Sequence, residues 1–181
     1  MERNALIKWL AIILSVFTAV LVIDLVTKHV FYYMFDTTII PGVISIQFAR
    51  NFGIAFGWFQ EAGWVLAVIS AVLIALAVTW FVLAKLGKIK THKQSMVFDI
   101  GMAFFIGGAV GNLVDRIFFG YVRDFIRFDF VNFPIFNFAD IFINVGLILL
   151  IIYIFKTMST RDIIKKDGKT DNQSENLGEQ A

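Results

Sequence analysis

Two aspartates in this sequence have the residue type and setting for acid–base chemistry. Asp124 lies in YVRDFI (121–126), and Asp140 lies in NFADIFINVG (137–146), at the start of an apolar stretch. An ionisable side chain beside such a stretch is costly and is therefore a functional candidate. Taken singly, Asp124 also fits a solvated loop, and Asp140 fits a charge favoured by a helix N-terminus. The connection of about sixteen residues between them is short enough to bring the two carboxylates together.

Two carboxyl groups in contact cannot both ionise cheaply, so one keeps a proton while the other is a base. The pair titrates as a unit, and the sequence does not assign the proton to either residue. The ionised group can take a proton from water while the neutral group donates a hydrogen bond to a peptide carbonyl. Such a pair permits amide hydrolysis without a covalent intermediate. It equally permits a proton-coupled carrier, because intramembrane carboxylates also relay protons.

The segment GGAVGNLVDR (107–116) carries polar residues at helical spacing. Gly108, Asn112 and Arg116 recur every four residues, so on a helix they share one face. Gly107 and Gly111 form a small-xxx-small pattern, which allows another helix to approach closely. The segment therefore predicts either a polar network at membrane depth or a helix-packing surface.

In two further pairs of polar residues, the two members lie about one helical turn apart. Asp24 and Lys28 are four residues apart and can form an ion pair, which a purely structural role would also explain. Asn137 lies three residues before Asp140, so on a helix the two side chains face the same way. Asp99 interrupts another apolar stretch near its start, where we expect it to reach the lipid headgroups without a functional role.

The composition places the chain in a membrane. Of its residues, 59% are hydrophobic and 17% are charged, which is more apolar than a soluble domain requires. A net charge of +2 gives no reason to expect nucleic acid as a partner. The sequence has no cysteine, and His29 and His92 are far apart and adjacent to lysines. We therefore expect no metal, no cofactor and no thiol or Ser–His nucleophile.

Four apolar stretches can serve as spans of a bilayer core about 30 Å thick. No A-x-A-like cleavage site precedes Asp24, so the first stretch is expected to be a retained helix. Lysines and arginines concentrate at the N-terminus and in two further segments, which predicts that these parts are cytoplasmic. Those two segments are residues 85–95 and 156–181, the outer connections are 24–61 and 115–137, and the predicted spans are 9–23, 62–84, 96–114 and 138–155.

The outer connections contain β-prone sequence. Residues 38–50 are rich in β-branched side chains around a Pro41-Gly42 turn, and residues 117–133 are aromatic. The predicted fold is membrane α-helical, with four transmembrane helices and a small extracytoplasmic β-sheet. Residues 1–155 are expected to form one domain, and residues 156–181 a polar, disordered cytoplasmic tail.

Five blocks of the sequence resemble, in order and spacing, the signature blocks of the lipoprotein signal peptidase (signal peptidase II) family. The resemblance covers roughly residues 6 to 155, and five blocks in this order on four spans make it highly specific. The blocks are DLVTK (24–28), RNFGIAFGWF (50–59), GGAVGNLVDR (107–116), YVRDFI (121–126) and FPIFNFAD (133–140).

The resemblance implies a function, a fold and a set of site residues. The family removes the signal peptide from bacterial prolipoproteins, just before a cysteine that carries a diacylglyceryl group. The implied fold is four transmembrane helices with a β-sheet cradle and a mobile outer segment over the site. The implied catalytic pair is Asp124 and Asp140, and supporting or substrate-binding roles are implied for Asp24, Lys28, Asn51, Gly108, Asn112, Arg116 and Asn137.

The resemblance also implies a setting. The chain is expected in the bacterial cytoplasmic (inner) membrane as a monomer among membrane lipids, with both termini cytoplasmic and the active site at the outer face. Two residues depart from the family pattern. Arg123 stands where the family is usually apolar, and Ile141 stands where a small or polar residue is common.

Two other classes of membrane protein also accommodate acidic residues at the ends of apolar helices. A proton-coupled carrier would favour inverted repeats with charges near the midplane, whereas here the carboxylates gather toward one face and no repeat is evident. A structural four-helix adaptor would leave the outer acidic residues without a purpose.

Overall fold

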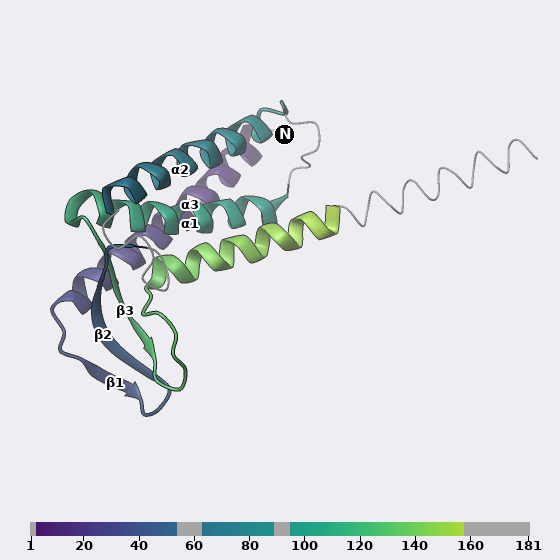
Figure 1. Cartoon of the computed structure of the whole chain (residues 1–181). Coiled ribbons are helices and arrows are strands. Elements are labelled where there is room, and N and C mark those ends of the chain that lie inside the picture. The colour runs from purple at the N-terminus through teal and green to yellow at the C-terminus, as the bar shows by residue number, and fades with distance from the viewer. Residues whose placement is uncertain (1–2, 54–62, 89–94, 158–181) are drawn as a thin grey trace, which may run out of the picture.

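The computed structural model describes residues 3–53, 63–88 and 95–157. Within these ranges, four helices are long and apolar enough to cross a membrane, as predicted. They are α1 (Arg3–Tyr32), α2 (Gly63–Lys85), α3 (Met96–Phe119) and the helix Phe138–Thr157, which carries no label in Figure 1 and is called the fourth helix below. Three stretches lie outside the described residues: 54–62, which includes the end of the second family-like block, 89–94 of the lysine-rich loop and 158–181 of the predicted tail.

Helix α1 continues through Asp24 to Tyr32 instead of ending at the charge. The reason is the ion pair between Lys28 Nζ and Asp24 Oδ2, which are 2.8 Å apart and both fully buried. A charge ends an apolar run in the sequence, but it does not end a helix when a partner one turn later neutralises it. The pairing predicted for these two residues is therefore present.

The sheet has three antiparallel strands in the order β1 (Thr37–Ile40), β2 (Ile44–Asn51) and β3 (Val122–Phe128). β1 and β2 are joined through the predicted turn, where Gly42 takes a positive φ of 72°. The sheet lies at the end of the helices where α1 and α3 finish and the fourth helix begins (Figure 1). This end is called the sheet end below.

After β3 the chain folds back on itself before the fourth helix. Phe136 pairs with Ile126 in an antiparallel bridge, with hydrogen bonds of 2.8 and 3.1 Å between their backbones. The bridge holds the residues that follow Phe136 beside β3. It therefore brings Asn137 and Asp140 next to the strand that carries Asp124.

Helix α3 is the packing centre. Half of its most apolar window is buried, against none of the corresponding window of α2. Glycines let neighbouring backbones come close, because a Cβ on Gly108 would lie 2.5 Å from the carbonyl oxygen of Ala139, and one on Gly146 would lie 2.6 Å from the backbone nitrogen of Phe105. The outward sides of the other helices are apolar and exposed, as expected for surfaces that face lipid.

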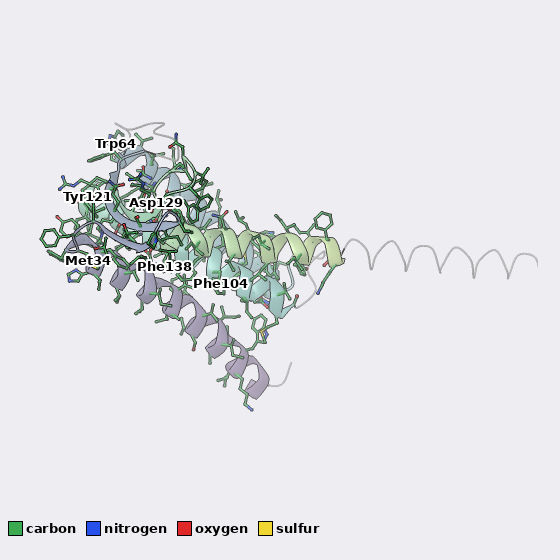
Figure 2. All side chains as sticks on the ribbon, turned by 90° about the horizontal axis from the view of Figure 1, so that it is seen from below. Met34, Trp64, Phe104, Tyr121, Asp129 and Phe138 are labelled. Carbon is green, nitrogen blue, oxygen red and sulfur yellow. The ribbon has the colours of Figure 1, made fainter. Side chains whose placement is uncertain are left out.

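Exposed aromatic side chains gather at the sheet end. Trp64 and the half-buried Tyr121 lie there in Figure 2, whereas Phe104 lies further along the helices. Tyr33 is 71% exposed and Trp64 is 73% exposed. Tyrosine and tryptophan are enriched where a membrane meets water, so the sheet end has the side chains of a membrane interface.

Asp99 does not reach the headgroups as predicted. It is completely buried and forms an ion pair with Lys85, whose ammonium also lies 3.7 Å from the ring centroid of Trp9. This cluster joins α1, α2 and α3 far from the sheet end. The error arose because a partner contributed by another helix is not visible in the local sequence.

We expect Asp99→Asn to lower the thermal unfolding midpoint in detergent, because it leaves the Lys85 charge without its partner. Breaking a buried pair from one side costs about 3 kcal/mol. The matched control is Lys88→Met, at an exposed lysine three residues beyond Lys85, which is expected to leave the midpoint unchanged. Equal midpoints for wild type and Asp99→Asn would show that this pair contributes no stability.

Candidate active site

Asp124 and Asp140 are brought together through one residue, Asn137. Its Nδ2 donates to Asp124 Oδ1 at 2.5 Å, and its backbone nitrogen donates to Asp140 Oδ2 at 3.1 Å. Both carboxylates line the same cavity. The juxtaposition predicted from the sequence is therefore present, across β3 and the first turn of the fourth helix.

The start of the fourth helix explains how Asp140 is held. Asn137 precedes the helix, and its Oδ1 accepts from the backbone nitrogen of Asp140 at 3.1 Å, while Asp140 Oδ2 accepts from the backbone nitrogen of Asn137. This reciprocal arrangement is a capping box. Asp140 thus satisfies the helix terminus and faces the cavity with the same side chain.

Each of the four carboxylate oxygens accepts a hydrogen bond from an N–H group. Besides the two from Asn137, Asp124 Oδ2 accepts from Asn51 Nδ2 at 2.9 Å. Asp140 Oδ1 accepts from Asn112 Nδ2 at 2.8 Å. The three asparagines come from β2, α3 and the segment before the fourth helix, so the carboxylates are fixed from three directions.

The orientation of each amide is set by a donor on its oxygen. Asn51 Oδ1 accepts from the backbone nitrogen of Gly53 at 3.1 Å, and Asn112 Oδ1 accepts from Lys28 Nζ at 2.8 Å. A lysine ammonium has donors only. Lys28 therefore requires Asn112 to present its oxygen to the ammonium and its NH2 group to Asp140.

Asp24 and Gly108 support the site without contacting its cavity. Asp24 Oδ1 accepts from the backbone nitrogen of Ala139 at 2.9 Å, which ties α1 to the first turn of the fourth helix. Gly108 lies against the carbonyl of Ala139, and Gly111 lies against the Asp24 carboxylate, where a Cβ would collide with it. The glycine spacing of α3 therefore serves close packing and the polar network together.

Arg116 lines the cavity but forms no hydrogen bond with either carboxylate among the described residues. Its Nη2 donates to the carbonyl oxygen of Gly53 at 3.3 Å, and its Nε has no hydrogen-bond partner in the described part of the chain. The three amides and Lys28 are thus joined to the carboxylates, whereas Arg116 stands beside them.

One buried pair next to the site was not predicted. Asp115, at the end of α3, accepts from the guanidinium and from the backbone nitrogen of Arg123 on β3. The signal in the sequence was an arginine within an otherwise apolar strand, directly before Asp124. The location of its partner could not be inferred, because the turn after α3 determines it.

The cavity has a volume of about 610 Å³ and continues from the carboxylates along the fourth helix. Its lining includes Ile148, which is 56% exposed, so this wall reaches the lipid-facing surface. Apart from the polar groups described above and Asn144, the lining is apolar: Val122, Phe128, Phe133, Pro134, Ile135, Phe136, Ile141, Val145 and Ile148. Ile141, one of the two departures noted in the sequence, is part of this wall.

Burial raises the pKa of Asp124, and the negative charge of Asp140 raises it further, to about 7. Hydrogen bonds from Asn51 and Asn137 and the charge of Lys28 act in the opposite direction and are outweighed. Near neutral pH, Asp124 therefore still binds a proton for part of the time.

Among the described residues, no three His, Asp or Glu side chains are grouped so that they could hold a metal ion.

Comparisons with known proteins show the family of this chain. Residues 16–156 match the sequence model of the family described as signal peptidase (SPase) II. The chain belongs to the signal peptidase II family. Its curated relatives include the lipoprotein signal peptidases of Gloeothece citriformis, 33% identical over 76% of this chain and 85% of the relative, and of Enterococcus faecalis, 36% identical over 64% and 67%.

A solved structure resembles the fold of this signal peptidase II family member. It is titled as a bacterial membrane enzyme structure by the in meso method at 2.3 Å resolution, and it is 26% identical in sequence. The TM-score is 0.72, with 83% of this chain and 91% of the other covered. Family and fold together identify a multi-pass bacterial membrane peptidase.

Replacing Asp124 by Asn is expected to stabilise the protein at high pH. The pKa of Asp124 in the folded state is about 7, above its ordinary value of 3.8, so the folded state binds this proton more tightly than the unfolded chain. The resulting stabilisation is complete below about pH 4 and is lost as the pH rises through about 7.

Thermal unfolding in detergent tests this linkage. The midpoint of Asp124→Asn is expected to exceed that of wild type at about pH 8, with the difference shrinking toward about pH 5. A difference that stays constant across this range would mean that Asp124 does not titrate there.

Proposed function

We propose that this protein is a membrane aspartic endopeptidase that removes the signal peptide from lipid-modified bacterial prolipoproteins. Cleavage occurs before the cysteine that carries the diacylglyceryl group, by water activated between Asp124 and Asp140. The observation that carries the proposal is that Asn137 donates to both carboxylates at the edge of one cavity. Membership of the signal peptidase II family supports the choice of substrate.

The reaction needs one proton on the pair. The ionised carboxylate takes a proton from water as the water oxygen attacks the scissile carbonyl carbon, and the protonated carboxyl donates to the carbonyl oxygen. When the C–N bond breaks, the leaving nitrogen takes a proton from the pair, and one proton remains between Asp124 and Asp140. The raised pKa of Asp124 supports this starting state near neutral pH.

The apolar cavity suits a lipid-modified substrate. A cavity of about 610 Å³ is in the usual range for ligand sites, and its wall along the fourth helix reaches the lipid-facing surface at Ile148. Acyl chains attached to the cysteine can remain in lipid while the peptide enters beside the carboxylates. Arg116 also lines this cavity, and its positive charge lies beside the two carboxylates.

The membrane orientation follows from the charges. The sheet end faces outward, because Lys85 ends α2 and Lys88 follows it at the opposite end, and clusters of positive charge favour the cytoplasmic side. A lipoprotein precursor inserted in the same membrane presents its modified cysteine at the outer surface. The carboxylates and the bond to be cleaved are then at the same depth.

Asp124→Asn and Asp140→Asn are each expected to lower cleavage of a diacylglyceryl-modified prolipoprotein peptide by at least about a thousandfold, because neither variant retains the acid–base pair. The measurement is the cleaved product by mass spectrometry, with purified full-length protein in detergent. Asp36→Asn, at an exposed aspartate between α1 and β1, is the matched control and should cleave at the wild-type rate.

Either asparagine variant cleaving at near the wild-type rate would show that the pair is misassigned. A chelator in the wild-type assay is expected to leave the rate unchanged. Loss of activity on chelation, restored by an added divalent metal, would point to a metal-dependent reaction instead.

The cleavage rate is expected to depend on pH through the proton shared by the pair. Because the pKa of Asp124 is about 7, kcat should fall as the pH rises above about 7 and the last proton leaves. A second decline is expected in acid, where both carboxyls are protonated. A rate that keeps rising to about pH 9 would contradict a protonated carboxyl as the acid.

A further inference from the structure

Arg123 makes an unusually complete contact with Asp115. Its Nη2 lies 2.8 Å from Asp115 Oδ1, its Nε lies 3.2 Å from Oδ2, and its backbone nitrogen donates to Oδ2 at 2.9 Å. Asp115 is completely buried, and Arg123 is only 6% exposed. The guanidinium carbon also lies 4.4 Å from the ring centroid of Phe119. Such a bidentate pair fixes both charge and geometry.

The pair belongs to a buried cluster in which charges balance. Asp24 and Lys28 on α1 lie beside it, and Lys28 Nζ is 2.8 Å from Asp24 Oδ2 and 3.6 Å from Asp115 Oδ2. These four side chains carry two negative and two positive charges. Because Arg123 neutralises Asp115, Lys28 needs only a long contact with Asp115, and it makes its short contacts to Asp24 and Asn112.

The balance bears on the candidate active site through Asn112. Lys28 holds Asn112 Oδ1, and Asn112 Nδ2 donates to Asp140 Oδ1. Without the arginine charge, Asp115 would be a buried carboxylate short of a partner, which is costly, and it would draw Lys28 from Asn112. The backbone of Arg123 acts in the same direction, because its carbonyl accepts from Asn137 Nδ2 at 3.4 Å.

We propose that Arg123 is a positioning residue, which neutralises Asp115 so that Lys28 keeps Asn112 oriented toward Asp140. It also anchors the start of β3, so that Asp124 faces the same cavity. The inference rests on the proposed peptidase activity and adds to it a buried residue that does not line the cavity. An arginine at this position explains how the carboxylate of Asp115, in addition to that of Asp24, can be buried beside Asp124 and Asp140.

Arg123→Met is expected to lower kcat by about tenfold or more while KM changes little, because substrate-binding groups are left in place. Arg123→Lys retains the positive charge but loses the two-point contact of the guanidinium with Asp115, so it should retain more activity than Arg123→Met. The double variant Arg123→Met/Asp115→Asn removes both charges and should recover part of the lost kcat. Size-exclusion chromatography and the unfolding midpoint establish that each variant is folded.

The pH profile separates positioning from loss of structure. In Arg123→Met, the uncompensated charge of Asp115 should move the alkaline limb of the kcat profile to higher pH, because a nearby negative charge raises the pKa of Asp124. The double variant should return the limb toward its wild-type place. The charged groups around Asp124 on the packed elements are Lys28 and Asp24 of α1, Asp115 and Arg116 of α3, and Asp140 of the fourth helix. Arg50 of β2 pairs with Arg123 in the strand register instead, and its guanidinium lies over the ring of Tyr121.

Arg127→Met is the matched control, because Arg127 lies on the same strand with its guanidinium on Gln47 and Asp129, away from the cavity. It should leave kcat and the pH profile unchanged. Wild-type kcat in Arg123→Met would overturn the proposal, as would a loss with an unmoved alkaline limb or one that Asp115→Asn does not relieve. Absence of cleavage by wild type would instead contradict the proposed function.

Discussion

The site depends on the direction in which three side-chain amides point. An asparagine can present either its oxygen or its NH2 group, and only the NH2 group can donate to an ionised carboxylate. Here a backbone N–H or an ammonium occupies each amide oxygen, so that Asn51, Asn112 and Asn137 all direct N–H groups toward Asp124 and Asp140. Two acidic groups can then line the same cavity while each of their oxygens accepts an N–H hydrogen bond.

That constraint explains why so much charge is buried near the sheet end. An ammonium sets the amide of Asn112, so Lys28 must lie inside the protein, and a buried ammonium needs a carboxylate. Asp24 supplies it and also holds the first turn of the fourth helix through Ala139. The capping box places Asp140 at the same helix terminus. The residues that cap the fourth helix, Asn137 and Asp140, are thus also members of the polar network.

Much of this could be read from the sequence, because it depends on local patterns. The four spans follow from apolar runs, the polar face of α3 follows from its four-residue spacing, and the Asp24–Lys28 pair follows from helix geometry. The meeting of Asp124 and Asp140 was predictable from the short connection between them. The capping box at Asn137 was also visible in principle, as an N-x-x-D pattern before an apolar run.

Other features depend on contacts between distant segments and could not be predicted. The burial of Asp99 requires Lys85 from another helix, and the burial of Arg123 requires the turn that brings β3 against the end of α3. A charged residue in an apolar strand indicates that it has a buried partner, but the local sequence does not identify that partner. The extension of α1 to Tyr32 is hidden for a related reason, since a charge ends the apolar run in the sequence whether or not it is paired in the fold.

The central claim is that Asp124 and Asp140 hold a single proton between them near neutral pH. Infrared difference spectra between wild type and Asp124→Asn, recorded across a pH titration, test it directly through the carboxylic acid C=O stretch. We expect one protonated carboxyl that belongs to this pair at about pH 6 and its loss as the pH rises through about 7. Two fully ionised carboxylates at about pH 6 would contradict the account.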